Sequence, residues 1–254
     1  VDAGEGPAIL LPEDFRLPPG GLGIRLPDTP LEQEERLIEY KLPAARAFAR
    51  ANGIDRLVVP SPQASLGIVA TGKAWLDVCQ ALTELGLPED EDLERAGIRL
   101  MKIGMPWPLD DARVRDFARG LDQVLVVEEK RPLIEDQLRS ILYGTPSAPR
   151  ILGKLDGEGR RQLQTAGELS PAQVARAIAD ALPAHARNER VERYLEFLRT
   201  REAALHEKPP TTTRQPLFCA GCPHSSSTPV PEGSRSMAGI GCHYMAQWIE
   251  PHTA

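Results

Sequence analysis

Residues 66–86, LGIVATGKAWLDVCQALTELG, decide how this chain folds. They open with LGIVA, an unbroken apolar run of strand length, and Thr71-Gly72 follows it as a turn. From Lys73 onward the apolar residues recur at helical spacing. The residues of this apolar helical face are Trp75, Val78, Cys79, Leu82 and Leu85. A strand that is apolar on both faces and leads directly into an amphipathic helix is typical of a parallel sheet covered by helices.

The same alternation continues along the chain and predicts an α/β domain over residues 54–155. The helical patterns DDARVRDFARGL and PLIEDQLRSILYG separate later apolar segments, and Asp110 or Asp111 is placed to cap the first of them. We therefore predict an open, mostly parallel sheet in which right-handed crossovers join the parallel neighbours. Its predicted strands are Arg56–Val59, Leu66–Ala70, Ile98–Ile103, Val124–Glu128 and Arg150–Leu152.

The segments on either side of this domain have different patterns. Residues 1–53 predict an extended arm rich in Gly and Pro, then a helix that Pro43 kinks or splits, together forming the end of a preceding domain. Residues 156–216 predict a helical connector that opens with a turn at Asp156-Gly157. It continues with a helix capped by Ser170 and a long charged helix, and it ends in a stiff, proline-rich linker.

The composition limits the classes of partner. With 254 residues, of which 41% are hydrophobic, the chain is long enough to bury one large core or two smaller ones. Its formal net charge of −6 and its pI near 5.5 argue against nucleic acid, because phosphate binding needs a basic surface. No apolar run approaches the roughly 18 residues of a membrane span, and no secretory signal is present. We therefore expect a cytoplasmic protein without membrane contact, and the chain looks cut at both ends.

Three loops follow the carboxyl ends of predicted strands, where open α/β sheets bind ligands. They are Thr71–Lys73, Gly104–Pro108 and Glu128–Arg131. The TGK sequence resembles the end of a phosphate-binding loop, but the upstream glycine is missing and Ala74 replaces the hydroxyl residue, which excludes nucleotide hydrolysis. The simplest interpretation of all three loops is turn and capping chemistry, with EEKR as a solvated or interface ion pair.

Residues 217–249, LFCAGCPHSSSTPVPEGSRSMAGIGCHYMAQWI, hold three of the four cysteines. Cys219 and Cys222 have the C-x-x-C spacing, with which one tight turn directs two sulfurs at a single metal centre, and Cys242 follows later. Zinc would need His224 or His243 as a fourth ligand, whereas an iron–sulfur cubane would need a fourth cysteine. The residues alone do not distinguish a zinc site from an iron–sulfur cluster.

Glycines lie beside the cysteines of this segment, and the remaining cysteine lies elsewhere in the chain. Glycines beside the cysteines allow backbone N–H groups to approach a cluster or an anionic cofactor closely. These glycines are Gly221, Gly233, Gly239 and Gly241. The fourth cysteine, Cys79, lies in the helical pattern of the α/β domain and is expected to be a small buried hydrophobic residue.

The sequence C-A-G-C-P-H followed by G-I-G-C-H resembles 2-oxoacid:ferredoxin oxidoreductases, and in particular the long fused indolepyruvate ferredoxin oxidoreductases of bacteria. GIVATGKAWLDV, GIRLMKIGMPWPL and VLVVEEKRPLIEDQL resemble the same family in the same order. The resemblance implies that residues 54–155 are similar to the carboxyl-terminal domain of transketolase. It also implies that residues 217–254 are the truncated start of a thiamine-diphosphate-binding domain.

The resemblance further implies a cofactor site in the cysteine segment. Cys219, Cys222 and Cys242 match three ligands of a [4Fe–4S] cluster, whose fourth cysteine would lie beyond Ala254. The residues expected at the bound cofactors are Gly221, His224, Gly239, Gly241, Cys242 and His243. The other cofactors implied are thiamine diphosphate with Mg²⁺, and coenzyme A as co-substrate.

The implied activity is oxidative decarboxylation of indolepyruvate, or another 2-oxoacid, to an acyl-CoA with ferredoxin as electron acceptor. The implied assembly is a homo-oligomer that contains the remaining domains of the parent chain, and the catalytic residues would lie outside this sequence. The G-D-G that opens a thiamine magnesium motif is absent, because Leu155 precedes Asp156-Gly157. The chain alone is therefore predicted to bind no thiamine diphosphate and to be inactive.

Two other functions stay open. In the first, the cysteines and one histidine hold a structural zinc in a non-catalytic interaction or scaffold module, which metal content would distinguish from an iron–sulfur protein. In the second, the α/β domain binds a small molecule at Thr71–Lys73, which ligand-dependent thermal stabilisation would favour.

Overall fold

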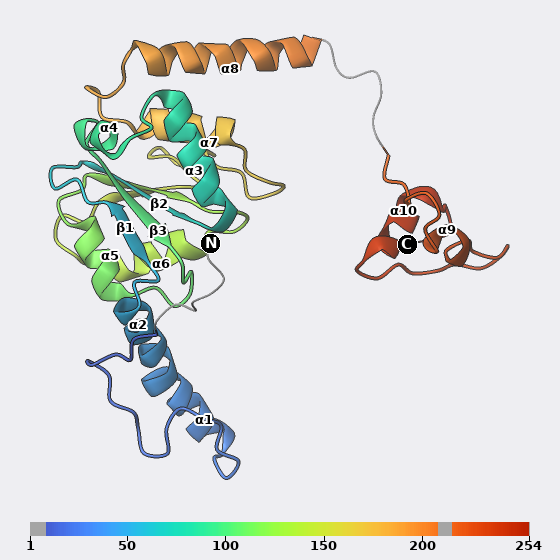
Figure 1. Cartoon of the computed structure of the whole chain (residues 1–254), viewed down its shortest axis with the longest axis horizontal. Coiled ribbons are helices and arrows are strands. Elements are labelled where there is room, and N and C mark those ends of the chain that lie inside the picture. The colour runs from blue at the N-terminus through green and yellow to red at the C-terminus, as the bar shows by residue number, and fades with distance from the viewer. Residues whose placement is uncertain (1–8, 208–214, 254) are drawn as a thin grey trace. The chain divides into compact units, whose positions relative to one another are not determined.

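The computed structural model describes residues 9–207 and 215–253, and the chain divides into two compact units, Val1–Arg199 and Thr200–Ala254 (Figure 1). The predicted linker, Lys208–Pro216, lies almost entirely outside the described residues. Within the described part of the chain, no helix combines the length and the apolar character needed to cross a bilayer.

The first unit is built on a five-stranded sheet with the strand order β1-β3-β2-β4-β5 (Figure 1). Strand β2 pairs in parallel with β3 and β4, and β4 pairs in parallel with β5. The strand bounds are β1 Arg56–Val59, β2 Leu66–Thr71, β3 Ile98–Ile103, β4 Gln123–Val127 and β5 Arg150–Leu152. These bounds lie within one residue of the prediction, and the open, mostly parallel α/β fold is confirmed.

Strand β1 differs from its parallel neighbours. It runs antiparallel to β3 and forms one edge of the sheet. Only residues 60–65 join β1 to β2. A crossover between parallel strands needs a dozen or more residues, so this short link reverses the chain direction instead. The antiparallel direction of β1 was not predicted, although the short link to β2 already indicates it.

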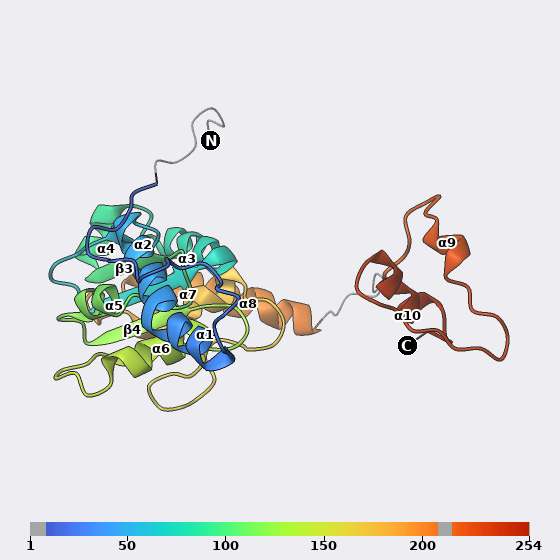
Figure 2. The same ribbon diagram turned by 90° about the horizontal axis from the view of Figure 1, so that it is seen from below.

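Helices cover both faces of the sheet (Figures 1 and 2). Those on one face are α3 (Gly72–Leu85), α4 (Asp90–Arg95), α7 (Pro171–Ala181) and the start of α8 (Glu189–Glu207), and those on the other are α5 (Asp111–Ala118) and α6 (Leu133–Leu142). Along β2, Leu66 and Ile68 enter the first layer and Val69 enters the second. Burial on both sides explains why the strand has no polar alternation.

The core of the first unit extends beyond residue 155, where we expected the α/β domain to end. Helix α7 begins with a capping box, in which the Ser170 hydroxyl accepts from the backbone of Gln173 and the Gln173 side chain accepts from the backbone of Ser170. Val174 and Ile178 of α7 are fully buried in the same cluster as β2, and α8 adds Val191. The helices predicted as a connector thus belong to the sheet domain's core.

The helix predicted around Pro43 continues without a break. It consists of α1 (Pro30–Arg36), a π-helical segment (Leu37–Lys41) and α2 (Leu42–Ala51). In the π-helical segment the N–H of Leu42 donates to the carbonyl of Leu37. This wider turn accommodates the proline ring, which clashes with the carbonyl four residues earlier in a regular α-helix. Gly53, at φ +57°, follows the end of α2 and its C-cap residue Asn52.

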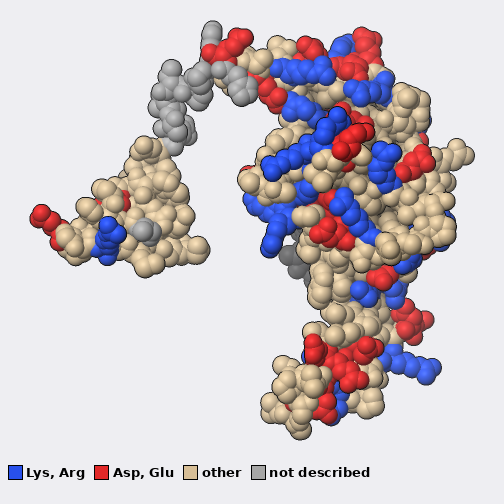
Figure 3. All heavy atoms as spheres, turned by 180° about the vertical axis from the view of Figure 1, so that it is seen from behind, with Lys and Arg blue, Asp and Glu red and all other residues tan. Residues whose placement is uncertain are grey.

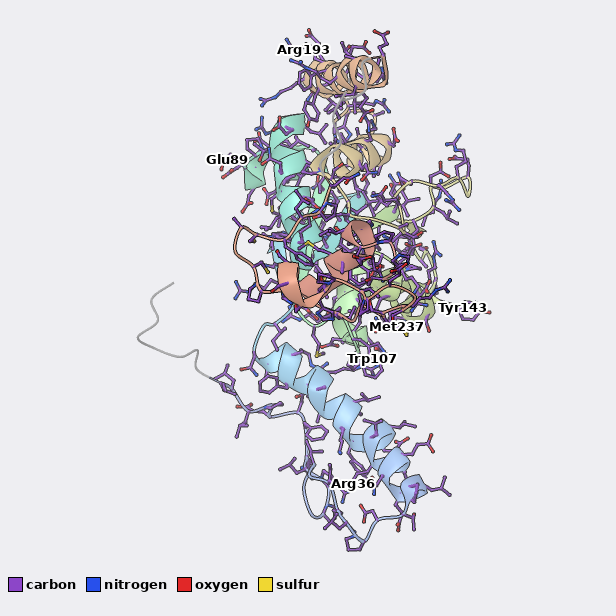
Figure 4. The ribbon with its side chains drawn as sticks, turned by 90° about the vertical axis from the view of Figure 1, so that its right-hand side faces the viewer. Arg36, Glu89, Trp107, Tyr143, Arg193 and Met237 are labelled. Carbon is purple, nitrogen blue, oxygen red and sulfur yellow. The ribbon has the colours of Figure 1, made fainter. Side chains whose placement is uncertain are left out.

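The second unit has little core of its own. Its short helices are α9 (His224–Ser227), a 3₁₀ helix (Cys242–Met245) and α10 (Ala246–Ile249). Within residues 215–253, Ala246 is the sole buried hydrophobic residue. The visible face of this unit carries few charges (Figure 3), and the Met237 side chain (Figure 4) is 90% exposed. Other large apolar residues exposed here are Leu217, Ile240, Trp248 and Ile249.

Candidate functional site

The C-x-x-C pair forms the tight turn that its spacing predicts. The N–H of Cys222 donates to the carbonyl of Cys219 over 3.0 Å, and Gly221 between them has a φ of +76°, which glycine adopts without strain. Cys219 is exposed and Cys222 is half-buried. One turn therefore presents two thiols on the surface of the second unit.

His224 is held against this turn. Its Nδ1 lies 3.2 Å from the Sγ of Cys222, and its ring stacks between Phe218 and His243, with ring centroids 5.5 Å and 6.2 Å away. Two histidines and one thiol therefore lie together, although they are separated in the sequence by up to twenty residues.

The glycines near Cys242 serve His243 in this structure. The N–H of Gly239 donates to Nε2 of His243 over 2.9 Å. A Cβ added at Gly239 would lie 3.1 Å from the same nitrogen, and one at Gly241 would lie 3.3 Å from Nδ1. The missing side chains thus make room for an imidazole, while the Cys242 thiol itself is exposed. The role of these glycines at a cluster or an anionic cofactor stays a prediction.

The residue types of this segment suit a soft metal, since thiolates bind iron–sulfur clusters and zinc. The positions of these side chains in the structure do not form such a site. No group of three His, Cys, Asp or Glu side chains among the described residues is arranged to hold a metal ion. The predicted convergence of Cys219, Cys222 and Cys242 is therefore not formed in this structure, and their role as ligands stays a prediction.

The three loops after the sheet strands do come together. Residues of Thr71–Lys73, Pro106 and the Glu128–Leu133 segment line one cavity of about 710 Å³. The interpretation of EEKR as a solvated ion pair was wrong for Glu128, which is 3% exposed. Its carboxylate accepts the N–H groups of Ile134 and Glu135 at 2.8 and 2.9 Å, at the start of α6. Burial raises the pKa of this carboxyl, against the effect of those donors.

Two further buried charges were missed by the sequence analysis. Lys154 is 6% exposed, and its ammonium donates to the carbonyl of Glu128. Glu135 is 1% exposed and accepts from the backbone N–H of Lys154 at 2.9 Å. Burial lowers the pKa of the Lys154 amine. The local sequence does not reveal the burial of either charge, because the partners lie 19 and 26 residues apart in the chain.

The sheet and its helical layers define an open α/β domain, joined to a thiol-bearing segment. A family model described as the indolepyruvate oxidoreductase domain matches residues 56–205, which is more than half of the chain. The chain therefore belongs to the indolepyruvate oxidoreductase domain family.

Curated relatives agree with this assignment. The chain is 29% identical to the indolepyruvate oxidoreductase subunit IorA of Methanothermobacter marburgensis over 224 residues, or 88% of this chain and 31% of that protein. It is 27% identical to the IorA subunit of Thermococcus kodakarensis over 164 residues, or 65% of this chain and 22% of that protein. The chain thus spans about a third or less of the curated relatives it matches.

A solved structure titled split gene transketolase, an inactive β4 tetramer, aligns with 50% of this chain and 40% of that chain. The TM-score is 0.37 and the sequence identity is 15%. The strand order and pairing of the sheet by themselves define the open, mostly parallel α/β fold.

Proposed function

We propose that this chain is part of a thiamine-diphosphate-dependent, iron–sulfur indolepyruvate ferredoxin oxidoreductase. In the whole protein, the reaction would be oxidative decarboxylation of an aryl 2-oxoacid to an acyl-CoA, with ferredoxin as acceptor. The observation that carries the proposal is the family match over residues 56–205. The alignment with the M. marburgensis subunit supports it, because at most 30 of 254 residues lie outside that alignment, so it extends beyond Cys222.

Within this proposal, the two units have different tasks. The α/β domain organises the assembly and carries no catalytic residue, and the cysteine segment supplies Cys219, Cys222 and Cys242 as three ligands of a [4Fe–4S] cluster. Thiamine diphosphate supplies the carbanion chemistry of decarboxylation when it is bound, and iron–sulfur clusters take up the electrons. The fourth cysteine, the Mg²⁺–diphosphate motif and the catalytic groups come from the rest of the parent protein, a cytoplasmic homo-oligomer.

The test is the Cys222→Ser variant of the full-length parent protein. We expect this variant to lose iron and acid-labile sulfide, because a thiolate ligand is missing, and to lose electron transfer to ferredoxin with it. The control is Cys79→Ser, which removes a thiol of α3 in the sheet domain and should leave the iron content unchanged. Circular dichroism should show a folded α/β domain in both variants.

Other outcomes would contradict the proposal in different ways. Full retention of iron and activity in Cys222→Ser would show that this cysteine is not a cluster ligand. A colourless parent protein that holds one zinc, and that loses it on replacement of His224 by Ala, would favour the structural zinc module. The 3.2 Å contact between Cys222 and His224 is the observation that makes His224 the histidine to test.

A further inference from the structure

The chain connections of the sheet change direction between β2 and β4. From β2 the chain passes through α3 and α4 to β3 on one side, whereas from β4 it passes through α6 to β5 on the other. In open α/β sheets, ligands bind at such a point, in the crevice outside the carboxyl ends of the two strands. This part of the first unit is therefore where its topology favours a ligand.

The cavity of about 710 Å³ lies at this point. Thr71 ends β2 and Gly72–Lys73 follow it, Glu128–Leu133 follows β4, and Pro106 comes from the loop after β3. Pro106, Pro132 and Leu133 give the cavity an apolar wall. Its size falls within the roughly 300–1,000 Å³ of small-molecule sites, which are mostly apolar with a few polar groups.

Most of the charges around the cavity are already paired. The Lys73 ammonium lies 2.9 Å from Asp77, 3.5 Å from Glu129 and 3.2 Å from Glu168. Hydrogen bonds to Asp77 first and then to Glu168 raise the pKa of Lys73 to about 12. The Glu128 carboxylate is occupied by the N–H groups at the start of α6. These groups hold the cavity's shape and are not free to recognise a ligand.

Two cations of the cavity wall remain uncompensated. Neither Lys130 nor Arg131 has an ion-pair partner among residues 9–207 and 215–253; the Lys130 ammonium contacts the carbonyl of Gly167, and the Arg131 side chain is exposed. Asp136 is the one lining carboxylate without a contact of its own in the same described ranges. The ionisable side chains that line the cavity sum to a net charge of zero, so its positive charge is local to Lys130 and Arg131.

We propose that this cavity binds a small organic monocarboxylate with an apolar body. The Arg131 guanidinium receives the carboxylate as a two-pronged donor, Lys130 adds a second positive charge, and the apolar body packs on Pro106, Pro132 and Leu133. A monoanion suits these two neighbouring cations, because a phosphate dianion would meet Asp136 and Glu129 at the same wall. This proposal concerns the α/β domain and does not depend on the function proposed above.

Phenylacetate is the probe, and its neutral amide, phenylacetamide, is the isosteric control. We expect saturable phenylacetate binding to the chain by titration calorimetry, with NMR shifts confined to the amides of Thr71–Lys73 and Glu129–Leu133. Arg131→Ala should weaken binding at least tenfold, because the bidentate donor is lost. Arg161→Ala, which removes an exposed arginine that does not line this cavity, should bind as the wild type does.

A cavity-filling variant, Leu133→Trp, gives an independent test because it blocks the site without removing a charge. It should abolish binding while the thermal unfolding midpoint stays the same or rises. The proposal is overturned if phenylacetamide binds as tightly as phenylacetate, if inorganic phosphate displaces phenylacetate at equal concentration, or if Arg131→Ala binds with wild-type affinity.

Discussion

A single buried side chain of the sheet, Arg99, bonds to the end of helix α5. Arg99 of β3 is 7% exposed, and its guanidinium donates to the carbonyls of Phe117 and Arg119 at the end of α5. It pairs with carbonyls rather than a carboxylate, so burial lowers the pKa of the guanidinium. The carbonyls at the end of a helix carry partial negative charge, which compensates this cation. Arg99 thus attaches α5 to the sheet.

Gly67 of β2 allows the same helix to approach closely. A Cβ at this position would lie 2.6 Å from Leu121 and 2.9 Å from the Phe117 ring. We predict that Gly67→Ala lowers the free energy of unfolding by about 1–3 kcal/mol, the usual cost of overfilling a packed core. Urea denaturation measures this loss. Gly23→Ala is the matched control, because its Cβ would meet no atom within 4 Å, and it should change stability by less than about 0.5 kcal/mol.

At the scale of elements, the start of α6 depends on a side chain from the preceding strand's end. The N-cap residue of α6 is Pro132, whose side chain cannot accept a hydrogen bond from the helix. The Glu128 carboxylate instead accepts three backbone N–H groups of the first turn. The N–H groups of a helix's first turn need such acceptors when water is excluded. Glu128 therefore couples the end of β4 to the start of α6.

Replacing Glu128 by Ala should cost about 1–2 kcal/mol, since three buried donors lose their acceptor and removal of a desolvated charge offsets part of the loss. Burial raises the pKa of Glu128 above its ordinary 4.5, so its contribution to stability is largest below pH 4.5 and falls as the pH rises through the folded-state pKa. Urea denaturation should show a larger loss at pH 5 than at pH 8. Glu94→Ala, at an exposed position in α4, should show no loss at either pH.

Strands and long helices were predictable because their apolar periodicity is local. The direction of β1, the short helix α4 and the buried Glu128 were not predicted. Helix α4 has a single buried apolar residue, Leu93, so no periodicity marks it. In the cysteine segment, the C-x-x-C turn follows from local spacing. The stacking of His224 on His243 depends on residues that are distant in sequence, and the pattern of residue types does not specify it.

At the scale of the whole molecule, the two units differ in what holds them together. The first unit has two buried layers on a sheet, whereas Ala246 alone is buried among residues 215–253. Large apolar side chains such as Met237 and Ile240, 90% and 95% exposed, cover part of the second unit's surface. Burial of apolar surface is the main source of stability, so the first unit should account for nearly all of the free energy of unfolding.

This difference predicts that a chain ending at Glu207 unfolds as the complete chain does. No described residue after Leu198 belongs to the buried apolar clusters of the first unit, so the truncation removes none of their contacts. We expect the thermal midpoint measured by circular dichroism to shift by less than about 2 °C. A chain ending at Leu182 is the matched control, because it removes Val191 and Leu195 of α8 from the core and should lower the midpoint by several degrees, about 4 °C or more. A clear drop in the midpoint for the chain ending at Glu207 would show that the cysteine segment stabilises the sheet domain, and the division of stability proposed here would be wrong.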